Sequence, residues 1–101
     1  MKNKRVEQTS EKTIYWGETA EEEMKQEDGN EWCEEKGGRL PTLKELEKAY
    51  EYKVEGFDPK RRYWSSTPYF FYFAYFVRFS DCNSGNGLSS LTCSVRCVYD
   101  K

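Results

Sequence analysis

Histidine is absent from this chain of 101 residues. Its absence excludes acid–base catalysis by imidazole and zinc sites with histidine ligands. A surplus of basic charge is lacking as well, because 16 Lys and Arg residues are offset by 18 Asp and Glu residues, for a net charge of −2. This balance excludes a nucleic-acid-binding protein that depends on electrostatic attraction.

Long apolar segments are also lacking. The densest apolar run, residues 69–79, is too short to cross a bilayer as a helix, so no membrane insertion is expected. The N-terminus is basic, but the apolar core of a signal peptide does not follow it. We therefore expect a soluble protein that is cytoplasmic by default or carried by a partner.

Five residue types are missing from one long part of the chain. Glu, Lys, Gln, Met and Trp together occur 31 times, of which 30 lie in residues 1–64 and one is Lys101. Residues 65–100 contain none of them. The chain is long enough for only one small domain, so this break falls inside a domain and not between two.

Four cysteines are present, Cys33, Cys82, Cys93 and Cys97, and they allow three pairings into two disulfides. Their spacing fits no zinc motif, so no metal site and no cofactor are expected. A cytosolic location would keep the thiols reduced, whereas an oxidising one would permit bridges. The residues alone leave both states open.

The first half of the chain predicts helices. Residues 20–36 are rich in Glu and Lys, and Thr19 with Glu22 has the spacing of a capping box. Residues 28–30 (Asp-Gly-Asn) weaken the middle, which predicts a helix that restarts near Asn30, and the Gly pair at 37–38 predicts its end.

A second capping box, Thr42 with Glu45, predicts another helix that fades near residues 51–53. A short β-prone run at residues 13–16 is predicted to end at Gly17.

The second half predicts strands. Residues 69–79 are predicted as a strand, residues 80–94 as a polar, loop-like stretch, and residues 95–99 as a closing strand. Helices followed by strands indicate an α+β domain with an antiparallel sheet.

Four short sequence motifs occur in a characteristic order along the chain. They are Trp-Cys at 32–33, Gly-Gly-Arg-Leu-Pro-Thr at 37–42, Tyr-Trp-Ser-Ser-Thr at 63–67 and Val-Arg-Cys-Val at 95–98. Together they resemble the C-type-lectin-like fold of the formylglycine-generating-enzyme type, in particular its bacterial branch with RLPT, YWSST and VRCV motifs. The resemblance covers about residues 13–99.

The resemblance implies two helices packed on a small antiparallel sheet with long irregular loops. Residues 13–101 would form the domain, and residues 1–12 a flexible arm or an edge strand. It also implies a disulfide between Cys33 and Cys97. The Glu-Pro-Asn and Trp-Asn-Asp motifs of calcium-dependent lectins are absent, and the reactive cysteine pair of the formylglycine-forming enzymes belongs to a much longer chain. No enzymatic activity is therefore expected.

The same branch includes the variable proteins of diversity-generating retroelements. In these systems template adenines are randomised, mostly in AAC or AAT codons, so the third base stays a pyrimidine. Such codons cannot encode Glu, Lys, Gln, Met or Trp, the types missing from residues 65–100. The alternative is that strands and turns avoid Glu and Lys anyway, but the polar stretch at 80–94 would ordinarily accept them.

We therefore expect a diversified ligand-binding region at residues 65–94, directed at an unknown partner that is expected to be a protein surface. The remaining residues that hold the fold and are not expected to vary are called the frame. Ala74, Val77 and Phe79 are predicted to point inward as parts of it. The positions expected to vary and to bind the ligand are Tyr69, Phe70, Phe71, Tyr72, Phe73, Phe76, Arg78, Asn83, Ser84, Asn86, Leu88, Ser89, Ser90 and Leu91.

Two other hypotheses stay open. One is a fixed adhesion or structural domain of the same fold that recognises a glycan or a cell-wall polymer, with Phe70, Tyr72 and Phe76 as a stacking platform. The other is a small thiol enzyme that uses Cys82 and Cys93.

Overall fold

The computed structural model describes residues 6–7 and 13–100. These residues form two helices and two three-stranded antiparallel sheets, with strand orders β1-β2-β6 and β3-β4-β5. The α+β class is thus confirmed, although the strands divide between two small sheets and do not form one. The elements in chain order are β1 Val6–Glu7, β2 Thr13–Thr19, α1 Gln26–Glu35, α2 Leu43–Glu51, β3 Arg62–Phe70, β4 Phe73–Arg78, β5 Asn83–Leu88 and β6 Arg96–Asp100.

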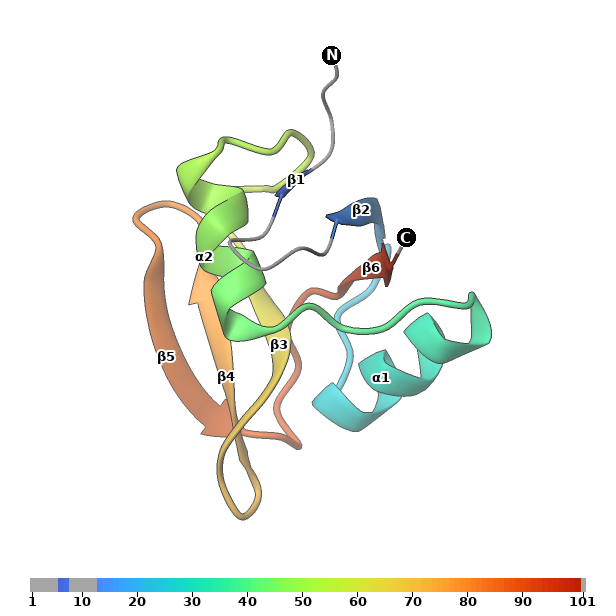
Figure 1. The fold of residues 1–101 in the computed structure, drawn as a ribbon. Helices are drawn as coiled ribbons and strands as arrows, with labels where there is room; N and C mark the ends of the chain where they lie inside the picture. The colour runs from blue at the N-terminus through green and yellow to red at the C-terminus, as the bar shows by residue number, and fades with distance from the viewer. Residues whose placement is uncertain (1–5, 8–12, 101) are drawn as a thin grey trace.

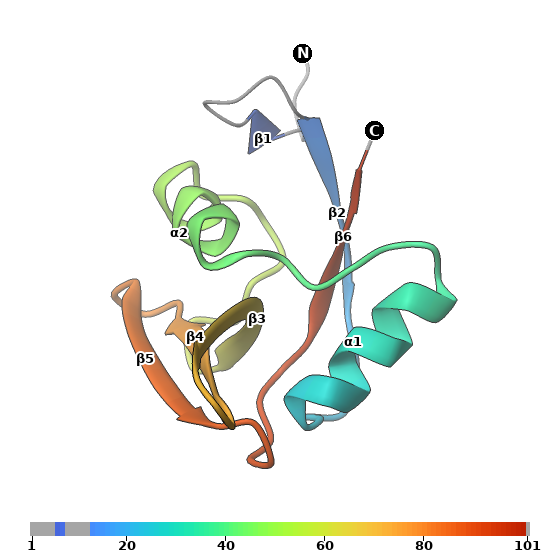
Figure 2. The same ribbon diagram turned by 60° about the horizontal axis from the view of Figure 1, so that its bottom comes forward.

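The first sheet brings the two ends of the domain together, whereas the second is a meander (Figure 1). Helix α2 packs on the second sheet, and α1 lies on the other side of the molecule, beside β6 (Figure 2). Residues 6–7 of the expected N-terminal arm form the edge strand β1. The rest of that arm, at positions 1–5 and 8–12, lies outside the described residues.

Both faces of the second sheet are packed. Trp64 is fully buried and pairs across the ladder with Phe76, on the face that adjoins the cluster around the disulfide. The next pair, Tyr63 and Val77, points to the opposite face, where Leu46 of α2 covers it. The part of the sheet that contains these two residue pairs is therefore packed on both faces, by the cluster around the disulfide on one and by α2 on the other.

The disulfide joins Cys33 in α1 to Cys97 in β6, 64 residues further along. This is the pairing that the resemblance implies. Both cysteines are buried in one cluster with Trp64 and Val95, so the bridge ties α1 to the core of the domain.

The Tyr-Trp-Ser-Ser-Thr segment of β3 holds the start of α2 by hydrogen bonds. The Ser66 amide donates to the Pro41 carbonyl at 2.7 Å, and the Leu43 amide donates to Thr67 Oγ1 at 2.9 Å. Pro41 has no amide hydrogen to place in a helix. These bonds fix where the second helix begins relative to the sheet.

The capping box at Thr42 and Glu45 is confirmed. Thr42 Oγ1 accepts from the Glu45 amide, and the Glu45 carboxylate accepts from the Thr42 amide. The same carboxylate receives two hydrogen bonds from Arg39, which also bonds Asp100 in β6. These bonds, first to Glu45 and then to Asp100, raise the pKa of Arg39 and connect α2 to the last strand.

The first helix differs from its prediction. It begins at Gln26 and not after Thr19, because Ala20 and Met24 are paired with the C-terminal part of the chain. The Ala20 amide donates to the Val95 carbonyl at 2.8 Å, and Met24 pairs with Cys93. The predicted capping box at Thr19 is not formed: the Thr19 hydroxyl is buried and has no hydrogen-bond partner among the described residues.

Gly29 does not interrupt α1, contrary to the predicted restart near Asn30. Gly29 is buried, and a Cβ there would lie 2.7 Å from Val95 Cγ2. The glycine is therefore a packing requirement in a continuous helix. Gly37, with φ of +87°, follows the helix end as predicted.

Strand β2 continues through Gly17, where the prediction ended it, because Gly17 faces the ring of Tyr99 on β6. A Cβ at Gly17 would approach that ring to 2.8 Å.

Candidate functional site

The aromatic run at 69–79 is a hairpin and not the single strand that was predicted. Strand β3 ends at Phe70 and β4 begins at Phe73, so the chain reverses at Phe71 and Tyr72. Phe71 has φ of +42°, a left-handed conformation that residues with a Cβ adopt rarely. No Gly, Asn or Pro occupies the turn, so the usual sequence signal for a reversal is missing.

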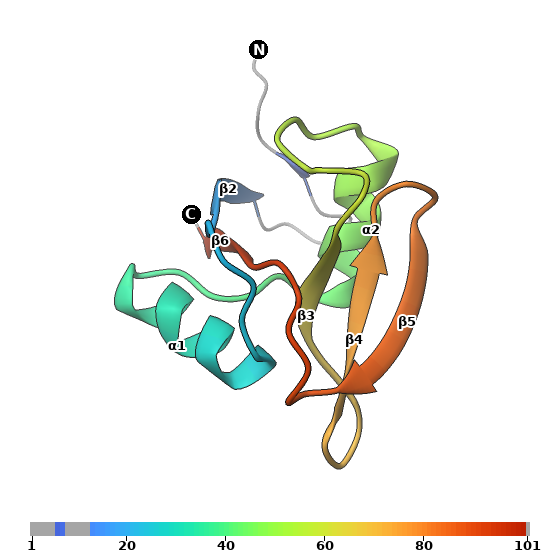
Figure 3. The same ribbon diagram turned by 180° about the vertical axis from the view of Figure 1, so that it is seen from behind.

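The hairpin tip, defined here as residues 69–73, projects from the body of the molecule (Figures 1 and 3). Three of its rings are the most exposed of the large apolar side chains among the described residues. The exposed fractions are 60 % for Phe70, 83 % for Phe71 and 77 % for Tyr72. The rings of Phe70 and Phe71 lie 4.4 Å apart, so they form one apolar surface. Contiguous exposed apolar area of this kind is typical of a binding surface or of an aggregation-prone site.

The polar stretch at 80–94, predicted as a loop, contains the edge strand β5. It pairs with β4 over six residues without a register shift. Phe76 of β4 lies opposite Gly85, and a Cβ at Gly85 or Gly87 would stand 3.0 or 3.4 Å from the Phe76 ring. The two glycines thus make room for the Phe76 ring. Because glycine has no side chain, the alternation of apolar and polar residues that usually identifies a strand is missing from the sequence of β5.

Aromatic rings also line the opposite face of this sheet, toward the hairpin tip. The register pairs Phe73 with Leu88 and Tyr75 with Asn86, which places these four side chains on one face. The Tyr69 ring stands edge-on to Tyr75 at 5.3 Å, which links the tip to the strands. We call the hairpin tip, Tyr75 and the exposed residues of β5 the aromatic patch.

Tyr75 is a patch residue that the sequence prediction missed. Its position two residues after Phe73 in an alternating strand is the signal that could have found it.

The structure brings most of the predicted positions to this surface. Three of the fourteen, Phe73, Phe76 and Ser89, are half-buried. Ala74 and Val77 are buried, as predicted, and so is Phe79. The exposed positions are Tyr69, Phe70, Phe71, Tyr72, Arg78, Asn83, Ser84, Asn86, Leu88, Ser90 and Leu91.

Phe76 belongs to the frame more than to the patch. Its ring contacts buried Trp64 at 6.0 Å between centroids, and the Arg62 guanidinium lies 5.2 Å from its centre. No ring contact among the described residues joins it to Phe70 or Tyr72. The three rings of the predicted stacking platform are therefore not assembled in this structure.

The aromatic patch carries no charge. Residues 63–77 and 82–95 contain no Asp, Glu, Lys or Arg. At its border Arg78 and Asp81 pair at 3.1 Å, and the hydrogen bond from Arg78 lowers the pKa of Asp81. A contact made by this surface would rest on apolar area and neutral hydrogen bonds.

The two remaining cysteines are apart from each other. Cys93 is buried in the cluster around Trp64, whereas Cys82 packs beneath α2 against the cluster of Tyr63. Burial raises the pKa of the Cys93 thiol to about 11 and is also the main cause of the raised pKa of Cys82. Both shifts disfavour the thiolate that a nucleophilic cysteine requires.

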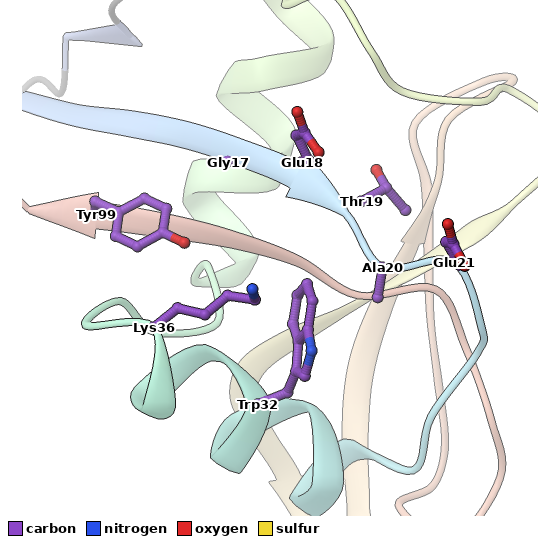
Figure 4. Close-up of a pocket in the computed structure, with 8 residues that line it drawn as sticks. All are labelled: Gly17, Glu18, Thr19, Ala20, Glu21, Trp32, Lys36 and Tyr99. Carbon is purple, nitrogen blue, oxygen red and sulfur yellow. The ribbon is translucent and has the colours of Figure 1, made fainter.

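A shallow groove of about 430 Å³ lies on the other side of the molecule, between α1 and the strands β2 and β6 (Figure 4). The Lys36 ammonium lies 4.6 Å from the centre of the Trp32 ring. None of the predicted ligand-binding residues reaches this groove. Its lining residues are Gly17, Glu18, Thr19, Ala20, Glu21, Trp32, Lys36 and Tyr99.

Within residues 6–7 and 13–100, no three Asp, Glu or Cys side chains gather as metal ligands would. Neither described helix has the length and apolar character needed to cross a membrane. A scan against protein-family models finds no match to the chain, and a search of curated proteins finds no similar sequence.

Proposed function

We propose that this protein is a C-type-lectin-like domain of the formylglycine-generating-enzyme type that serves as the variable protein of a diversity-generating retroelement. It would bind a ligand, a protein surface by preference, through the aromatic patch. The observation that carries the proposal is that the part of the chain with the restricted residue alphabet also supplies the exposed, uncharged aromatic surface.

The separation of frame and patch supports this function. The disulfide, the Arg39 network and the buried Trp64 lie away from the exposed rings, so the frame does not depend on which side chains the patch displays. Tyr and Phe offer large, rigid contact area at low entropic cost, as in antibody paratopes. Asn86 and Ser84 of β5 add polar groups beside them.

Strand β5 also weighs against the alternative explanation of the missing residue types. Exposed edge strands are commonly protected by charged side chains, Lys above all. In β5, Asn83, Ser84 and Asn86 are exposed at such an edge, yet residues 82–95 hold no Lys or Glu. A general aversion of strands to charge does not account for an edge without Lys, whereas a codon set that cannot encode Lys or Glu removes the residues that most often protect such an edge.

The gene provides the decisive experiment. Codons at the exposed patch positions should end in C or T, and a near-copy of the 3′ coding region should carry AAC or AAT at the same positions. Sibling genes should differ at Tyr69 to Tyr72 and in β5 but agree at Trp64 and Cys97. Purine-ending codons at most patch positions would refute retroelement diversification.

The second candidate is a fixed domain of the same fold that binds a neutral glycan through the tip rings. The absence of charge in the patch is compatible with such a ligand. Identical residues at 68–94 in sibling copies would favour it. A glycan array read with the protein and with a Phe70→Ser/Tyr72→Ser variant then separates the two: only a glycan binder would show signals that the variant loses.

A further inference from the structure

Among the outer edges of β3, β5 and β6, that of β5 is the exception. The outer edge of β3 is covered, because Ser94 exchanges backbone hydrogen bonds with Arg62 and Trp64 at 2.8 and 3.0 Å. The outer edge of β6 is covered by Arg39, which exchanges two such bonds with Val98. Within the described residues no strand pairs with the outer side of β5, although its last carbonyl, that of Leu88, accepts from the Leu91 amide at 2.9 Å in a turn. Strand β5 lies at the outside of the sheet in Figures 1 and 3.

This edge also lacks the features that keep edge strands apart. Strand β5 has the sequence Asn-Ser-Gly-Asn-Gly-Leu, with no charge and no Pro, and its ladder to β4 contains no bulge. By contrast, β3 carries Pro68 and two register shifts. An unprotected, regular edge is a template on which another strand can pair.

We propose that the partner of this edge is a second copy of the chain, which pairs its β5 antiparallel to the first. An antiparallel pair of identical strands is symmetric about a two-fold axis, so every hydrogen bond made in one direction is repeated in the other. The result is a six-stranded sheet, β3-β4-β5-β5-β4-β3. The area that six residues bury is small, so the dimer belongs to the weak, transient class.

The absence of charge on β5 favours its pairing with a second copy of itself. Residues 82–95 are uncharged, so no like charges face each other when β5 meets its own copy. The small side chains of Ser84, Gly85 and Gly87 leave the backbone accessible for close approach.

The symmetry determines where the aromatic patches lie. The two-fold axis of an antiparallel pair within one sheet is perpendicular to that sheet, so each face of one copy continues as the same face of the other. Tyr75 and Asn86 of both copies would therefore lie on one side of the joined sheet. The dimer would present two patches to one surface, and their linkage would add avidity. The pairing itself stands independently of the function proposed above.

Sedimentation of the full chain from micromolar to millimolar concentration tests the pairing. The weight-average mass is expected to rise from 12.0 kDa toward twice that value. The variant Ser84→Lys/Asn86→Lys places two exposed lysines on each edge and should remain monomeric at every concentration. The matched control Glu34→Gln/Glu35→Gln changes the net charge equally, from −2 to 0, on exposed positions of α1, and should dimerise as the parent does.

Hydrogen exchange distinguishes this dimer from one made by the aromatic tip. Amides of residues 83–88 should become more protected as the concentration rises, and a Phe71→Ser/Tyr72→Ser variant should dimerise unchanged. A monomer throughout the concentration range, or a dimer that is lost with the tip rings and leaves β5 exchange unchanged, would overturn the proposal. Neither result bears on the codon test, so the two proposals fail separately.

Discussion

Removal of the Cys33–Cys97 disulfide should destabilise the domain mainly through its unfolded state. The bridge closes a loop with a sequence separation of 64 residues. In the chain-entropy description a loop of this length restricts the unfolded chain enough to contribute about 4 kcal/mol to the free energy of unfolding. For a domain of about 100 residues such a loss lowers the melting temperature by roughly 4–8 °C for each kcal/mol.

The assay is urea unfolding of the parent with its bridge intact, of the reduced parent and of a Cys33→Ala/Cys97→Ala variant. The reduced parent keeps both buried sulfur atoms, so its difference from the bridged protein isolates the covalent link. A Cys82→Ser variant, altered at a half-buried free thiol, is the control for cysteine replacement.

The dependence on urea separates the two possible origins of the effect. If the bridge acts on the unfolded chain, its removal exposes more surface on unfolding and increases the m-value. A reduced protein that loses less than about 1 kcal/mol, with an unchanged m-value, would refute the loop-closure reasoning.

Three further predictions concern single sites. Gly29→Ala should lower the free energy of unfolding by about 1–3 kcal/mol despite the better helix propensity of Ala, because its Cβ meets Val95 at 2.7 Å; a gain in urea stability would contradict this. The pKa of Cys93 is raised to about 11, so the unfolded thiol ionises first as the pH rises. The stability that this thiol contributes is full below about pH 9 and should be lost toward pH 11, by up to about 2–3 kcal/mol, and a Cys93→Ala variant titrated alongside should lack this component of the slope. Phe71→Gly should raise the melting midpoint by the equivalent of about 1 kcal/mol, because it relieves a left-handed residue whose ring is 83 % exposed; a lower midpoint would show that the ring supports the fold.

Local signals predicted the second helix well. The capping box at Thr42, the Pro before it and the apolar positions Leu46 and Ala49 all act within a few residues of each other, and the structure preserves each of them. The capping-box pattern at Thr19 and Glu22 gave a wrong prediction, because no helix begins there. Instead, the Ala20 amide donates to the Val95 carbonyl and Met24 pairs with Cys93, partners 75 and 69 positions away that no local pattern reveals.

The glycines also show that a local sequence pattern does not reveal packing against distant elements. Gly29, Gly85 and Gly87 read as breakers in the sequence, yet each lies inside a regular element. Gly29 is required by Val95, which a Cβ would approach to 2.7 Å, and Gly85 leaves room for the Phe76 ring, which a Cβ would approach to 3.0 Å. Such a requirement depends on the packing of distant elements, so only the folded chain shows it.

The hydrogen bonds of the hairpin indicate that its exposed side chains can be exchanged without loss of the fold, as the proposed function requires. Two bonds that hold its strands in place are accepted by backbone carbonyls of patch residues: Ser65 Oγ donates to the Tyr75 carbonyl at 2.8 Å, and the Ser89 amide donates to the Tyr72 carbonyl at 2.7 Å. A carbonyl oxygen is present whatever the residue at 72 or 75. Since the exposed rings of Tyr72 and its neighbours contribute little to the core, we expect their replacement to change what the patch would bind much more than it changes the fold.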